Sequence, residues 1–142
     1  RRQRQMCIRD SLWTHPRDQS TRYNTLAYWT EMARTLEAAL FDGIFLADVV
    51  GVYDVYGGHA DAALRGGVQV PVNDPMLLIP AMAAATQHLG FGVTANLVYE
   101  APYLFARRMS TLDHLTGGRV GWNIGTQPRD MLGRFVRPRL GS

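Results

Sequence analysis

The chain has 142 residues, of which 46% are hydrophobic and 19% charged, a composition typical of one ordinary globular domain. No apolar run approaches the roughly 20 residues that span a bilayer, so no membrane span is expected, and no secretory signal pattern opens the sequence. The single cysteine excludes an internal disulfide, which allows a reducing compartment without demonstrating one, and we expect a cytoplasmic protein.

The net charge of +3 comes from the two ends of the chain. Residues 1–10 and 127–142 each carry +3, whereas residues 11–126 carry −3. A basic tail can bind nucleic acid, but neither end interleaves aromatic residues with its arginines as a single-strand groove would. We therefore favour solvated ends over a nucleic-acid-binding module, and expect residues 1–10 to be non-native or disordered.

An amphipathic helix and a buried strand are the first predicted elements. Apolar residues recur every three or four positions over residues 25–40, which predicts a helix capped by Asn24. The continuous apolar run at 44–47 is typical of a parallel strand buried on both faces, and it stops at Asp48. Residues 49–73 form a long connection, whose length and tyrosines favour a ligand-facing loop.

A second helix is predicted from Asp74 to Leu89. Asp74 would cap it, Pro75 would lie in its first turn and Gly90 would follow its end. Pro80 lies inside this helix, where it should remove one hydrogen bond and introduce a bend.

Residues 90–126 read as strand, helix and strand. Residues 91–93 predict the first strand and residues 120–124 the second. Between them, a helix should begin at Pro102 and close at the glycine pair 117–118. Since helices and strands alternate along the chain without a hairpin signal, we expect a parallel sheet with outer helices.

Two α/β folds satisfy this alternation, a doubly wound sheet and a (β/α)8 barrel. The sequence has neither Gly-x-Gly-x-x-Gly nor Gly-x-x-x-x-Gly-Lys, which disfavours a nucleotide-binding doubly wound sheet. A complete barrel needs about 250 residues, so this chain could hold about the first half of one. We predict that residues 11–126 form the amino-terminal part of a TIM barrel, and that residues 127–142, with two prolines and four arginines, are an atypical basic tail.

Polar residues stand where the three predicted strands stop. On a barrel they would converge on one mouth and could bind a planar polar ligand, although each could instead cap the following loop. Taken together, we interpret them as a binding site; they are Asp48, Thr94, Asn96 and Asn123. The histidines and Cys7 lack metal-binding spacing, and no serine lies in a nucleophile elbow, so neither a metal site nor a hydrolase is expected.

Several sequence runs resemble a known family. FLAD, EAPYLFAR, LDHLTGGR and GWN, within residues 12–125, resemble the bacterial-luciferase-like flavin monooxygenases. The resemblance is strongest to the branch of nitrilotriacetate monooxygenase component A and dibenzothiophene-sulfone monooxygenase. It implies a (β/α)8 barrel about three times this length. It also implies reduced FMN from a separate flavin reductase, O2 that oxygenates a small organic substrate, and possible homo-oligomers.

The resemblance also places cofactor contacts. Asp48 after FLA and Thr94 in GVTA match positions where the family contacts flavin, and Asn123 in GWN is a further candidate at the next strand end. It identifies no catalytic residue. The alternative is a truncated, non-catalytic remnant of such an enzyme.

Overall fold

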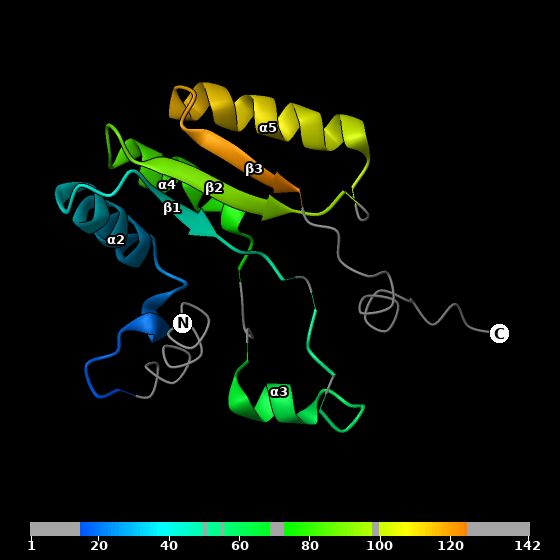
Figure 1. The fold of residues 1–142 in the computed structure, drawn as a ribbon. Helices are drawn as coiled ribbons and strands as arrows, with labels where there is room; N and C mark the ends of the chain where they lie inside the picture. The colour runs from blue at the N-terminus through cyan, green and yellow to red at the C-terminus, as the bar shows by residue number, and fades with distance from the viewer. Residues whose placement is uncertain (1–14, 50, 55, 69–72, 98–99, 125–142) are drawn as a thin grey trace, which may run out of the picture.

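Three parallel strands form the sheet in the computed structural model, which describes residues 15–49, 51–54, 56–68, 73–97 and 100–124. The strands lie side by side in the order β1-β2-β3 (Figure 1). Both pairs are parallel, as the sequence predicts. Their bounds are Gly43–Leu46 for β1, Gly90–Ala95 for β2 and Val120–Ile124 for β3.

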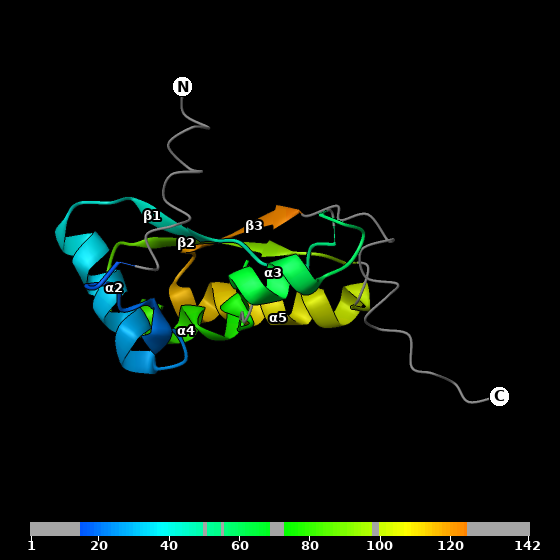
Figure 2. The same ribbon diagram turned by 90° about the horizontal axis from the view of Figure 1, so that it is seen from below.

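Helices precede and separate the strands along the chain. The bounds are Ser20–Arg22 for the 3-10 helix η2, Leu26–Ala38 for α2, Asp61–Gly66 for α3, Pro75–Leu77 for the 3-10 helix η3, Ile79–Ala84 for α4 and Pro102–Thr116 for α5. Figure 2 shows α2, α4 and α5 on one face of the sheet. The predicted long connection at 49–73 therefore contains a short helix, α3. The predicted segments 1–10 and 127–142 lie outside the described residues.

The cap of α2 differs from the prediction. Asn24 lies in a turn, and Thr25 is the capping residue, whose Oγ1 accepts a hydrogen bond from the backbone N–H of Tyr28 at 3.4 Å. Thr25 has the extended backbone that a cap requires, with φ −115° and ψ 137°. The helix ends at Ala38, two residues before the predicted Leu40, which has a left-handed φ of 61°.

The predicted helix over 74–89 is wrong in its length and continuity. Asp74 does cap its start, because Oδ1 accepts the N–H of Met76 at 2.9 Å. The segment then divides into η3 and α4, and Pro80 lies in the first turn of α4, where a missing N–H costs nothing. Helix α4 ends at Ala84, five residues before the predicted Leu89.

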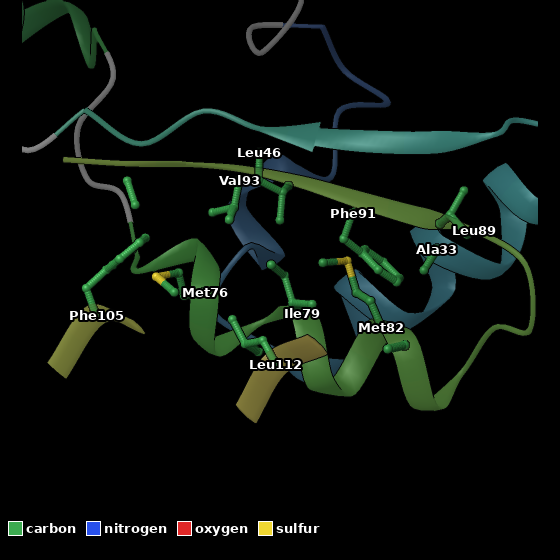
Figure 3. Close-up of a cluster of buried hydrophobic side chains, with 12 residues drawn as sticks. Ala33, Leu46, Met76, Ile79, Met82, Leu89, Phe91, Val93, Phe105 and Leu112 are labelled. Carbon is green, nitrogen blue, oxygen red and sulfur yellow. The ribbon is translucent and has the colours of Figure 1, made fainter. Parts of the chain in front are cut away.

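The core lies between the sheet and the helices (Figure 3). Phe91 and Val93 of β2 point toward the helices and are almost fully buried, together with Ile79 and Met82 of α4 and Leu89. The prediction that residues 44–47 are buried on both faces is not met in the described residues. Only the helix-covered face of β1 is buried there, so Phe45 on the other face is 57% exposed.

Glu37 of α2 fastens the segment that enters β2. Its carboxylate accepts backbone N–H groups from Gln87 at 2.9 Å, from Leu89 at 3.1 Å and from His88. The N–H of His88 is the main cause of a lowered pKa of the Glu37 carboxyl. These bonds hold residues 87–89 in a bend, so His88 does not lie in a helix end as the predicted helix would require.

Arg119, just before β3, joins three elements. Its guanidinium donates hydrogen bonds to the carbonyl oxygens of Ala83 at 2.9 Å, Leu89 at 3.1 Å and Thr116 at 2.8 Å. The same group lies 5.6 Å from the ring centroid of Phe91. The guanidinium of arginine is planar and carries several N–H donors, so it can make all of these contacts at once. Together they tie the ends of α4 and α5 to the start of the sheet.

Candidate functional site

The strand register places the polar strand-end residues on one face of the sheet. Phe91 and Val93 point toward the helices, so the alternating residues Gly92 and Thr94 point to the opposite face, here called the inner face. Gly92 pairs with Gly121 and Thr94 with Asn123 across β2 and β3. The inner face therefore ends, at the carboxyl edge of the sheet, in a threonine and an asparagine.

Thr94 and Asn123 contact each other directly. Asn123 Nδ2 donates a hydrogen bond to Thr94 Oγ1 at 3.3 Å. Thr94 is half-buried and Asn123 is exposed. The structure thus brings together two of the three residues that the sequence predicts for cofactor binding.

Asp48 stands two residues beyond β1, and Asp74 is its charged neighbour. The Asp48 side chain is half-buried, and this burial raises its pKa, with a further contribution from the negative charge of Asp74. Asp74 itself caps η3. Asp48 therefore offers a carboxylate in an environment where a hydrogen-bond donor or a positive charge would be favourable.

The other predicted strand-end residue is Asn96. It is half-buried and directly follows β2. Tyr53 and Tyr56, predicted to face a ligand, line an open cavity of about 310 Å³ with residues of the α3 segment. Tyr56 is 81% exposed.

A second hollow lies among the helices rather than on the inner face. It has a volume of about 420 Å³ between η3, α4 and α5, and its lining includes the exposed Leu77, Leu104 and Leu115. Arg108 forms an ion pair with Glu100 at its rim. This groove is separate from the Thr94–Asn123 pair.

Neither a metal-binding cluster nor a membrane-spanning helix occurs within the described part of the chain. No group of three or more His, Cys, Asp or Glu side chains is arranged to hold a metal ion there. None of the helices described is long and apolar enough to cross a membrane.

The amino-acid sequence matches the luciferase-like monooxygenases over residues 8–135. The chain belongs to this family. The resemblance drawn from FLAD, LDHLTGGR and GWN is thereby confirmed.

Individual family members share much of the sequence. Dimethyl-sulfide monooxygenase of Hyphomicrobium sulfonivorans is 64% identical over 112 residues, which cover 79% of this chain and 23% of that protein. Dibenzothiophene-sulfone monooxygenase of Rhodococcus erythropolis is 41% identical over 123 residues, covering 86% of this chain and 27% of that protein. The chain thus spans about a quarter of the length of these relatives.

Solved structures of the family share the fold. A long-chain alkane monooxygenase superposes with a TM-score of 0.82 at 53% identity, covering 92% of this chain and 31% of that one. A riboflavin lyase, solved with modified FMN and riboflavin, has a TM-score of 0.78 at 40% identity, covering 89% and 29%. With the parallel sheet and its outer helices, these matches confirm the predicted partial (β/α)8 barrel.

Sequence reasoning missed two residues that hold the amino-terminal ends of β2 and β3, opposite the candidate site. Glu37 and Arg119 fix the segment before β2 and the start of β3, and both strands end in the predicted site residues. Arg119 closes the family run LDHLTGGR, which marked the position without indicating its contacts.

Proposed function

We propose that this chain is the cofactor-contacting segment of a monooxygenase that uses reduced FMN and O2 to oxygenate a small organic substrate. One observation carries the proposal. In a chain of the luciferase-like monooxygenase family, Thr94 and Asn123 form a hydrogen-bonded pair at the carboxyl edge of a parallel sheet. Barrels of this kind place their active sites at that edge.

The residues at this edge fit a flavin ring. The edge of an isoalloxazine carries carbonyl oxygens and an N–H group, so it needs both donors and acceptors. Thr94 and Asn123 supply a hydroxyl and an amide, and Asp48 supplies a carboxylate. Gly121 leaves the inner face beside Asn123 without a side chain, which provides space for a planar ring next to the Phe45 ring that covers Gly92.

Each residue has a binding role in this account. Asp48 accepts a hydrogen bond from a ring N–H, and that bond would offset the unfavourable burial of its charge. The hydrogen-bonded Thr94–Asn123 pair orients the ring from two adjacent strands, which are more rigid than loops. The bound reduced flavin supplies the electrons for the reaction with O2.

The partners follow from the same proposal. We propose that a separate flavin reductase delivers reduced FMN, that the reaction takes place in the cytoplasm, and that the complete protein forms homo-oligomers. The proposed substrate is a small organic molecule, and its identity is determined by loops, which select substrates in such barrels. We propose neither a nucleic-acid partner nor a membrane partner.

A chimera tests this function. Dimethyl-sulfide monooxygenase of H. sulfonivorans is the host, and residues 15–124 of this chain replace its matching segment, since the two sequences are 64% identical. With reduced FMN and O2, the folded chimera should consume dimethyl sulfide, as the host does. A chimera that folds like the host but consumes none would contradict the proposal and favour the non-catalytic alternative.

A further inference from the structure

The hydrogen bond between Asn123 and Thr94 has a direction. The amide nitrogen Nδ2 of Asn123 carries only donor hydrogens, so Thr94 Oγ1 is the acceptor of the 3.3 Å contact. A hydroxyl has one hydrogen to donate and two lone pairs to accept with. Because one lone pair of Thr94 faces Asn123, the hydroxyl hydrogen points away from Asn123 and is free for another acceptor.

The neighbours of Thr94 on the inner face offer no side-chain acceptor for that hydrogen. Thr94 and Asn123 are register partners on this face. The residues two positions earlier on both strands are Gly92 and Gly121, which have no side chain to accept a hydrogen bond. The Thr94 hydroxyl is therefore prepared to donate to a molecule that occupies the inner face.

We propose that Asn123 is a positioning residue, which holds the Thr94 hydroxyl as a donor toward a carbonyl oxygen of the flavin ring. This inference rests on the proposed function. The inference extends the proposed function because it assigns Asn123 a role that acts through Thr94. It also specifies that the Thr94 hydroxyl is the donor to the flavin. Asn123 then contributes to flavin affinity through the polarity of its amide and not through its shape alone.

Asn123→Asp separates polarity from shape. Aspartate has nearly the shape of asparagine, but its oxygens accept hydrogen bonds, so the Thr94 hydroxyl would turn to donate to it. The chimera described above and its variants are titrated with oxidised FMN, whose ring is uncharged, by flavin fluorescence. Loss of the single hydrogen bond from Thr94 should raise the Kd about three- to tenfold.

A double-mutant cycle isolates the route through Thr94. Thr94→Val and Asn123→Asp should each raise the Kd to a similar degree, and the double variant should be no weaker than Thr94→Val alone. Thr94→Ser keeps the hydroxyl and should retain the affinity of the unsubstituted chimera. If Asn123 were merely structural, or if the new charge acted directly on the flavin, the two substitutions would act independently. The Kd of the double variant would then rise by the product of the two single effects.

The outcomes separate this inference from the proposed function. A folded, unsubstituted chimera that does not bind FMN overturns both. A chimera that binds FMN but is indifferent to Asn123→Asp overturns only the inference.

If Asn123→Asp does not fold, the 142-residue chain itself gives the second measurement. In its ¹⁵N–¹H spectrum, Thr94→Val should shift the side-chain amide signals of Asn123, and Thr94→Ser should leave them in place. Asn123 signals that do not respond to Thr94→Val would overturn the inference.

Discussion

The ring of Phe45 lies directly against the backbone of Gly92. A Cβ built at Gly92 would be 3.0 Å from Cδ2 of Phe45, closer than ordinary contacts allow. The two residues are register partners on the inner face of β1 and β2. Phe45 therefore uses the space that a side chain at residue 92 would occupy, and the strand needs glycine there.

Gly92→Ala should consequently destabilise the chain. The new methyl group forces the Phe45 ring out of its place, and such overpacking costs about 1 kcal/mol when the ring can move aside. Gly121→Ala is the matched control, because its nearest atom would be 4.0 Å away, the carbonyl oxygen of Phe91. Thermal unfolding followed by circular dichroism compares the two. Equal effects at both positions would contradict the assigned contact.

Arg119→Lys should lower stability although the charge is kept. Lysine cannot reproduce the set of hydrogen bonds to Ala83, Leu89 and Thr116, so buried carbonyl groups lose partners, at a cost of about 1–2 kcal/mol. Arg107→Lys, on the exposed surface of α5, should change stability by less than about 0.5 kcal/mol. Urea unfolding of both variants measures the difference. An Arg119→Lys variant as stable as the control would show that these bonds contribute nothing.

The contribution of Glu37 should depend on pH. The backbone N–H of His88 lowers the pKa of Glu37 below its ordinary 4.5. The folded chain therefore gains stability from the ionised carboxylate above pH 4.5, and this gain is lost as the pH falls through the lower folded value.

Glu37→Gln should accordingly lower the Tm at pH 7, and the difference from the unsubstituted chain should shrink in acid. Glu31→Gln is the control on the same helix, since Glu31 only pairs with Arg22 on the surface. It should have the smaller effect on Tm. A Tm deficit of Glu37→Gln that persists unchanged in acid would refute the assignment.

Much of the fold follows from the sequence because its signals are local. The apolar run at 120–124 and the proline at 102 predicted β3 and the start of α5 where the structure has them. The alternation of helices and strands was enough to predict a parallel sheet. The helix predicted over 74–89 failed because its predicted end was taken from Gly90, whereas Glu37 binds the backbone of residues 87–89 in a bend.

The sequence indicates that the candidate site residues stand at strand ends, but not which of them contact each other. Thr94 and Asn123 are 29 positions apart, and only the strand register shows that they are neighbours. Glu37 and Leu89 are 52 positions apart, and Arg119 and Leu89 are 30 apart, so no periodicity could pair them. The electrostatic influence of Asp74 on Asp48 likewise depends on how the connection after β1 returns to the sheet.

Asp74→Asn should lower the pKa of Asp48. Burial is the larger cause of the raised pKa and the charge of Asp74 the smaller, so the pKa should fall but remain above the ordinary 3.8. Asparagine can still accept the N–H of Met76, which preserves the cap of η3.

The raised pKa of Asp48 also has a consequence for stability. Because the folded pKa of Asp48 is raised, the chain loses stability as the pH rises from 3.8 through the folded value, and Asp74→Asn should reduce this loss. A ¹³C titration of the Asp48 carboxyl measures the pKa directly. An unchanged pKa in Asp74→Asn would mean that the two carboxylates do not interact.

The most direct test of the central claim is the affinity of the chimera for reduced FMN with and without Asp48→Ala, titrated without oxygen. If this segment supplies the flavin-contacting edge, the unsubstituted chimera binds reduced FMN, and Asp48→Ala raises the Kd about tenfold, as loss of a hydrogen bond to a charged group does, with no change in circular dichroism. An equal affinity for both folded proteins would remove Asp48 from the site. A folded chimera without affinity for reduced FMN would contradict the assignment of this edge to the flavin.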